Sequence, residues 1–205
     1  MKLWPMKTAM QKLLYPPTGA IRWMLLLMAL AGLTACAKPQ PTVVVLVGGL
    51  GMSQLGDVKA AVKQRCPEAD VVSAGWWDAY KEDPAALARE KPRERIIMVG
   101  HSFGCKTVAE AAAKLPAVDL AIFIEPAWND VSVPRNVRRV LWFQRSELGF
   151  TRKAKILAGV KPVVIDGGHN TVTEAPTLIS GVVEAINQIT WERQASARNS
   201  SRTTR

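Results

Sequence analysis

A serine stands between a predicted strand and a predicted helix, in the segment 100–104 with the sequence GHSFG. The largely apolar residues 95–99 before it predict a short buried strand, and the alanine-rich residues 106–115 after it predict a helix. Gly-x-Ser-x-Gly in this setting is the pattern of a nucleophile elbow, in which the glycines permit a turn too tight for a Cβ atom. We therefore predict that Ser102 is a nucleophile. The alternative is an ordinary turn serine that caps the helix.

A serine hydroxyl needs a base within hydrogen-bonding reach to be a useful nucleophile at neutral pH, and the chain has two histidines. His101 adjoins Ser102 in the turn, where neighbouring side chains diverge, so we expect it to pack beside the sheet. His169 follows a predicted strand and two glycines that would let it lean over the edge of the sheet. We predict that His169 is the general base. The alternative is a histidine in a surface loop.

A carboxylate that accepts a hydrogen bond from Nδ1 of the base would orient it and stabilise the imidazolium. Glu125 comes at the end of the predicted strand 118–124 and is our first candidate for this acid. Glu147 comes after the next predicted strand and is the alternative. Asp130 and Asp166 are weaker candidates.

An oxyanion hole would use the backbone N–H of Phe103, which follows the serine, and a second N–H from the loop after the first strand. That loop, residues 48–52, is glycine-rich, and Leu50 or Gly49 would donate. It lacks the Gly-Lys-Ser/Thr ending of a phosphate-binding loop, so we do not expect a nucleotide. No group of His, Cys and carboxylate residues has metal-ligand spacing, and we expect neither a metal nor a cofactor.

Strands and helices alternate along the chain from position 41 onward. We expect strands at 41–47, 70–74, 95–99, 118–124, 137–143 and 162–165, and helices at 53–65, 83–91, 106–115 and 171–191. This alternation predicts an α/β fold, a three-layer α/β/α sandwich with about six parallel strands and right-handed crossovers. Every candidate residue above then falls at the carboxyl end of a strand, where binding sites in such sheets gather.

The order serine, acid, histidine, with the histidine after the last strand, resembles the α/β-hydrolase superfamily over roughly residues 42–189. The segment 121–127 (AIFIEPA) is similar to the Asp-Pro-Ala stretch of pancreatic-type lipases, with Glu125 in place of the aspartate. Only 11 residues separate Glu125 from the next predicted strand, too few for a cap domain, so the chain looks like a minimal hydrolase similar in scale to cutinases.

The resemblance implies a serine hydrolase that acts on small-molecule or lipid esters or thioesters. Trp76, Trp77 and Trp128 fall on loops at the same edge of the predicted sheet and could line the substrate pocket. The alternative for these tryptophans is packing at the rim. The alternative for the whole chain is an envelope protein that uses a hydrolase fold as a binding or assembly module without turnover.

Residues 1–41 are predicted to lie outside the folded domain. A basic lead precedes the apolar run 23–33, whose 11 residues are too few to span a bilayer and have the length of a signal-peptide core. Residues 33–36 (LTAC) resemble the lipobox of bacterial lipoproteins, which implies cleavage before Cys36 and acylation of that residue. The alternative is a plain secretory signal.

The predicted organisation is therefore a signal peptide, a short tether, a hydrolase domain and a basic disordered tail, at 1–35, 36–41, 42–191 and 192–205. We expect a lipid-anchored protein of the bacterial cell envelope that faces the periplasm. Ala37 does not resemble the aspartate associated with inner-membrane retention, which favours the outer membrane.

The formal net charge of +10 overstates the basicity of the predicted domain, because eight of the 27 Lys and Arg residues lie outside positions 36–191. No basic and aromatic stripe suggests nucleic acid, and we expect a monomer. Cys66 and Cys105 are predicted to lie at opposite ends of the sheet, too far apart for a disulfide.

Overall fold

The computed structural model describes residues 42–49, 55–75, 83–90, 95–127, 130–146, 156–157 and 159–203, with side chains up to Glu192. Within them six strands form one parallel sheet in the order β2-β1-β3-β4-β6-β8. The strands are β1 (Thr42–Gly48), β2 (Ala69–Gly75), β3 (Arg95–His101), β4 (Leu120–Ile124), β6 (Val140–Arg145) and β8 (Val163–Ile165). The predicted α/β fold with six parallel strands is confirmed.

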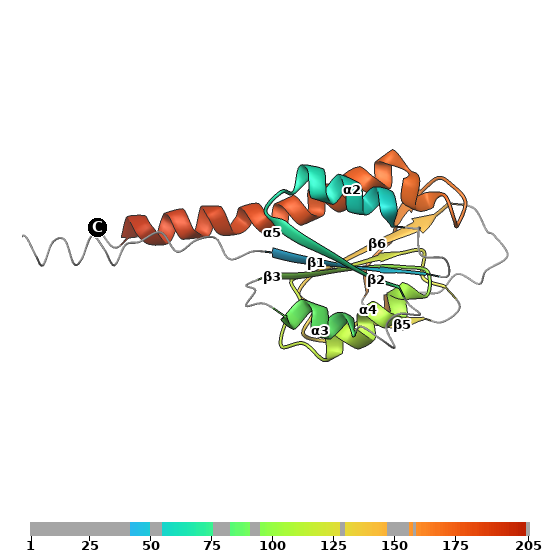
Figure 1. The fold of residues 1–205 in the computed structure, drawn as a ribbon, viewed down its shortest axis with the longest axis horizontal. Helices are drawn as coiled ribbons and strands as arrows, with labels where there is room; N and C mark the ends of the chain where they lie inside the picture. Colours follow the sequence, from blue (N-terminus) through green and yellow to red (C-terminus); the bar gives the residue numbers. More distant parts are fainter. Residues whose placement is uncertain are drawn as a thin grey trace, which may run out of the picture. The chain divides into compact units, whose positions relative to one another are not determined.

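Helices cover both faces of this sheet (Figure 1). They are α2 (Gly56–Arg65), α3 (Pro84–Arg89), α4 (Gly104–Ala113) and α5 (Pro176–Thr203). α2 and α5 pack on one face and α3 and α4 on the other, which makes three layers. A short 3-10 helix, η2 (Val172–Glu174), precedes α5.

The strand β1 shows why the sheet lies in the centre of the domain. Four of its seven residues are valine, and the strand is buried along its whole length. Val44 and Leu46 pack in the cluster under α2 and α5, whereas Val43, Val45 and Val47 pack in the cluster under α3 and α4. A strand that is apolar on both faces is stable only between two layers, and this is the signal from which the sequence predicts a parallel sheet.

Several boundaries differ from the prediction. β6 begins at Val140, three residues later than expected, because Val137 pairs with Val118 only as an isolated bridge. A second, two-stranded sheet of β5 (Val131–Ser132) and β7 (Ile156–Leu157) was not predicted, since two-residue strands leave no periodic pattern.

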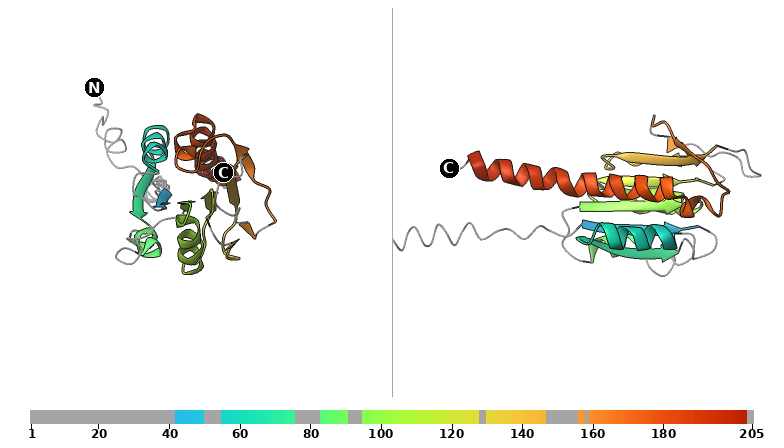
Figure 2. Two further views of the ribbon diagram at one scale, coloured as in Figure 1. Left: turned by 90° about the vertical axis from the view of Figure 1, so that its right-hand side faces the viewer. Right: turned by 90° about the horizontal axis from the view of Figure 1, so that it is seen from above.

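The end of the chain requires a correction. We predicted a disordered tail over residues 192–205, but α5 continues to Thr203 and runs past the amino ends of the strands (Figure 2). No proline or glycine follows Gly181, and the basic and alanine residues of this stretch are strong helix formers. The helix begins at Pro176, where the missing N–H of proline is tolerated.

We call the side of the sheet where the parallel strands end the carboxyl edge, and the opposite side the amino edge. Ser102, Glu125 and Arg145 all stand at the ends of neighbouring strands, β3, β4 and β6, and so share the carboxyl edge. None of the helices in the described ranges is long and apolar enough to cross a membrane.

Candidate active site

The elbow around Ser102 has the tight geometry that its glycines predict. Ser102 has a φ of 55°, in the left-handed region that side chains rarely adopt. A Cβ atom on Gly100 would lie 2.7 Å from the carbonyl oxygen of Gly104, and one on Gly104 would lie 2.2 Å from the carbonyl oxygen of Val47. The two glycines are therefore required by close backbone approach, and the second brings the start of α4 against the end of β1.

Glu125 repeats this backbone strain one strand away. Its φ is 46°, and Glu125 and Ser102 are the non-glycine residues with positive φ in the described part of the chain. Their backbones are held by neighbouring strands: the N–H of Ser102 donates to Ile124 O at 2.9 Å, and that of Glu125 donates to Phe143 O at 3.0 Å. Strained residues held in place by a surrounding sheet are typical of functional sites.

The structure brings together the side chains of the three residues that the sequence analysis selects for chemistry. His169 Nε2 lies 3.0 Å from Ser102 Oγ, and His169 Nδ1 lies 3.5 Å from Glu125 Oε2. Ser102 and Glu125 are buried, and the side chain of His169 is 23% exposed. A hydroxyl, an imidazole and a carboxylate in this order can transfer a proton away from the hydroxyl and stabilise the resulting imidazolium.

A second cation contacts the carboxylate, and the sequence analysis did not select it. Arg145 is the last residue of β6; its backbone N–H donates to Glu125 Oε1 at 2.5 Å, and its Nε lies 3.0 Å from Glu125 Oε2. The available signal was a charged residue two positions after the predicted strand 137–143. Burial alone would raise the pKa of Glu125, but the hydrogen bonds from His169 and Arg145 and the charge of Arg145 hold that pKa below its usual value.

His101 points into the protein, as the sequence analysis expects. It is fully buried, and neither ring nitrogen has a hydrogen-bond partner in the described part of the chain. Burial, followed by the nearby His169, lowers the pKa of His101 to about 4, so its ring is neutral at physiological pH. The ring centroids of His101 and His169 are 5.1 Å apart, which places a neutral buried ring beside the candidate base.

The predicted oxyanion donors are described in part. Phe103 is the residue before α4, at the helix N-terminus, where the helix dipole favours negative charge. Gly49 is buried at the end of β1, the strand that Gly104 contacts. Leu50 lies outside the described residues, as do Glu147, Trp76, Trp77, Trp128 and Cys36.

The two remaining cysteines are both buried and unbonded. Cys105, in the first turn of α4, donates its thiol hydrogen toward Gly100 O at 3.2 Å and Ile124 O at 3.4 Å, and burial raises its pKa strongly. Burial also raises the pKa of Cys66. The part of the chain that the structure describes contains no group of three or more His, Cys, Asp or Glu residues that could hold a metal ion.

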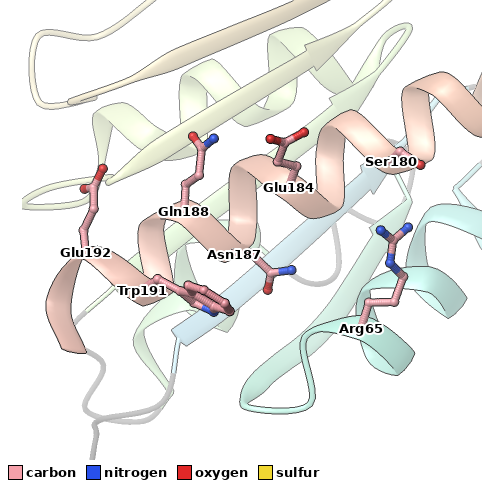
Figure 3. Close-up of a pocket in the computed structure, with 7 residues that line it drawn as sticks. All are labelled: Arg65, Ser180, Glu184, Asn187, Gln188, Trp191 and Glu192. Atoms are coloured by element: carbon pink, nitrogen blue, oxygen red, sulfur yellow. The ribbon is translucent and has the colours of Figure 1, made fainter. Parts of the chain in front are cut away.

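A groove lies away from this cluster, between α2 and α5 (Figure 3). It has a volume of about 500 Å³ and contains the exposed indole of Trp191. Its lining residues are Arg65, Ser180, Glu184, Asn187, Gln188, Trp191 and Glu192. None of them belongs to the predicted site, and Arg65 and Glu192 stand toward the amino edge.

Comparison with known proteins supports the fold. No protein-family model matches the sequence, and no curated protein sequence matches it significantly. The structure is similar to that of Est1E from Butyrivibrio proteoclasticus, with a TM-score of 0.51 and 15% identity, over 75% of this chain and 90% of that one. It also matches the esterase domain of a Rhodothermus marinus protein, with a TM-score of 0.32 and 17% identity, over 44% of this chain and 43% of that one.

The similarity to Est1E extends over nearly the whole of that chain, and at 15% identity it establishes the fold alone. Six parallel strands between two helical layers, together with this similarity, define a three-layer α/β fold like that of Est1E.

Proposed function

We propose that this protein is a serine hydrolase that cleaves carboxylic esters or thioesters. The observation that carries the proposal is the contact of 3.0 Å between His169 Nε2 and Ser102 Oγ, with Glu125 on the opposite side of the imidazole. The esterase-type fold and the strained backbone at Ser102 support it independently.

In the proposed reaction, Ser102 Oγ attacks the acyl carbonyl carbon while His169 Nε2 accepts the hydroxyl proton. His169 then gives this proton to the departing alcohol or thiol as the bond to the leaving group breaks, which leaves an acyl-serine. Water loses a proton to His169 and attacks the acyl carbon. His169 then returns this proton to Ser102 Oγ as the bond between Oγ and the acyl carbon breaks, and the carboxylic acid is released. Glu125 orients the imidazole and stabilises its charged form.

The negative charge on the carbonyl oxygen would be stabilised by the Phe103 N–H and by a second donor, Leu50 or Gly49. The close packing of Gly104 against Val47 supports this pair, because it brings the first turn of α4 to the end of β1. We further propose that the three loop tryptophans Trp76, Trp77 and Trp128 line the acyl pocket.

A fluorophosphonate probe tests the proposal directly, since it reacts covalently with an activated serine. We expect the wild-type protein to be labelled and the Ser102→Ala variant to remain unlabelled. Thermal unfolding of both proteins would show that the variant is folded. If wild-type protein that is folded fails to react, the hydrolase proposal is wrong, and a binding or assembly module becomes the better interpretation.

The substrate class requires a second measurement. A panel of p-nitrophenyl esters with increasing acyl length, with a thioester series of the same lengths, would report kcat/KM for each substrate. A maximum at short chains would indicate an esterase, and activity that rises with chain length would indicate a lipase-like pocket.

We also propose that the protein is anchored to a bacterial membrane through acylation of Cys36. The resemblance of residues 33–36 (LTAC) to a lipobox supports this proposal. Membrane fractionation of wild-type protein and of a Cys36→Ser variant tests the anchor, with release of the variant into the soluble envelope fraction as the expected result.

A further inference from the structure

The carboxylate of Glu125 is held at both oxygens by one neighbouring residue. Arg145 donates from its backbone N–H to Oε1 and from its side-chain Nε to Oε2. The pairing of β4 with β6 explains this arrangement, because Ile124 is opposite Phe143 and Glu125 therefore leaves β4 beside the last residues of β6, which still pair with β8. Both side chains are largely buried, with 12% exposure for Arg145 and 7% for Glu125.

His169 approaches the oxygen that Arg145 Nε already contacts. The distance from Oε2 is 3.0 Å to Arg145 Nε and 3.5 Å to His169 Nδ1, so the arginine makes the closer contact. The contact fixes the rotation of the carboxylate, and it also places a permanent positive charge next to the negative charge that faces the imidazole.

We infer that Arg145 is a positioning residue for the proposed hydrolysis: it fixes the Glu125 carboxylate in the orientation that His169 uses and partly neutralises the pull of that carboxylate on the histidine proton. The kinetic consequences of this inference rest on the proposed function. The elbow motif and the predicted acid do not by themselves imply that an arginine holds the carboxylate.

The sign of the electrostatic effect follows from the charges around the imidazole. In the described part of the chain the Glu125–His169 pair lies against Arg145 from β6, His101 from β3 and the buried thiol of Cys105 from α4, whereas the carboxylate of Asp166, three residues before His169, accepts a hydrogen bond from Ser146 Oγ at 2.9 Å. His101 and Cys105 are neutral at physiological pH, so Arg145 is the charge that opposes Glu125. Without it, His169 would hold its proton more tightly, and less of the unprotonated base would be present at a given pH.

The test replaces Arg145 with glutamine, which removes the charge but keeps the backbone N–H that donates to Oε1. We expect kcat on a p-nitrophenyl ester to fall about tenfold, with little change in KM, because the acid is less well oriented. The acid limb of the pH–rate profile is expected to move upward by about half a pH unit to one unit.

Two further variants distinguish a positioning role of Arg145 from the effect of losing any arginine of this strand region. Arg145→Lys keeps the charge, so its pH–rate profile should stay close to that of the wild type and part of kcat should return. Arg139→Gln removes an arginine–glutamate pair at the other end of β6 and should change neither quantity. An unchanged profile in Arg145→Gln, or an equal displacement in Arg139→Gln, would overturn the inference.

A measurement without turnover distinguishes this inference from the proposed function. The chain has two histidines, so NMR can follow the imidazole of His169 through a pH titration, with a His101→Phe variant to assign the signals. The titration midpoint of His169 should move upward in Arg145→Gln. If the wild-type protein neither reacts with the fluorophosphonate probe nor hydrolyses esters, the proposed function is wrong. The titration midpoint of His169 in Arg145→Gln then decides by itself whether Arg145 acts on His169.

Discussion

Strand β6 carries an arginine–glutamate pair at each end, and the two pairs are in different surroundings. Arg139, just before the strand, contacts both oxygens of Glu192 at 2.9 and 2.8 Å, but the two side chains are 48% and 51% exposed. Arg145, at the other end, contacts Glu125 with 12% and 7% exposure. The same two residue types meet in both places, so the environment and not the pairing chemistry separates them.

The difference extends to the two edges of the sheet. At the carboxyl edge, buried polar side chains share hydrogen bonds and two non-glycine residues have positive φ. In the described residues of the amino edge no non-glycine residue has positive φ, and both side chains of the pair Arg139–Glu192 are about half exposed. Solvent screens such pairs, whereas a buried carboxylate depends on every partner that it has.

We expect the largest effect on activity from replacing Glu125, the proposed acid at the carboxyl edge. In Glu125→Gln the amide no longer stabilises the imidazolium, and we expect kcat to fall by about 10³-fold or more, as measured on the best ester of the panel. Glu147→Gln is the matched control, because Glu147 is the other glutamate that the sequence offers for this role. Near-wild-type turnover in Glu125→Gln together with loss in Glu147→Gln would reverse the assignment.

A smaller effect on stability should come from the buried ring beside the site. The pKa of His101 is about 4 when folded, below its usual value of 6.5, so the unfolded chain binds more protons between these values. Stability should therefore fall as the pH drops from about 6.5 to 4, with this group contributing up to about 3 kcal/mol of the loss. Urea unfolding of wild type and His101→Phe across this range measures the difference; parallel curves would contradict the prediction.

The elbow itself should tolerate no added atom. In Gly104→Ala the new Cβ would lie 2.2 Å from Val47 O and would push α4 away from β1. We expect the free energy of unfolding to fall by about 2 kcal/mol. Gly56→Ala, at the start of α2, has no atom within 4 Å of the new Cβ and serves as the control, with unchanged or slightly raised stability.

We expect the smallest effect on stability and activity from a substitution at the amino edge. Arg139→Gln removes the exposed pair with Glu192, and we expect no resolvable change in Tm or in ester hydrolysis. A marked loss of stability in this variant would show that the two ends of β6 are more alike than their exposure indicates.

The sequence predicted much of this fold because its signals are local. The valine run of β1 and the glycines around Ser102 act over a few neighbouring residues, and both features appear where expected. The helical end of α5 was not predicted, because polar and basic composition was interpreted as disorder although its residues favour a helix.

The candidate site, like the fold, was predictable where its signals are local and not where they depend on tertiary contacts. By itself the sequence determined the elbow, the parallel sheet and the short choice of residues, since two histidines and strand-end carboxylates leave few combinations. Tertiary structure decided that Glu125 lies within 3.5 Å of His169 and that Arg145 holds it. These contacts join residues 20 to 44 positions apart, and their distances depend on strand order and register, which no local pattern encodes.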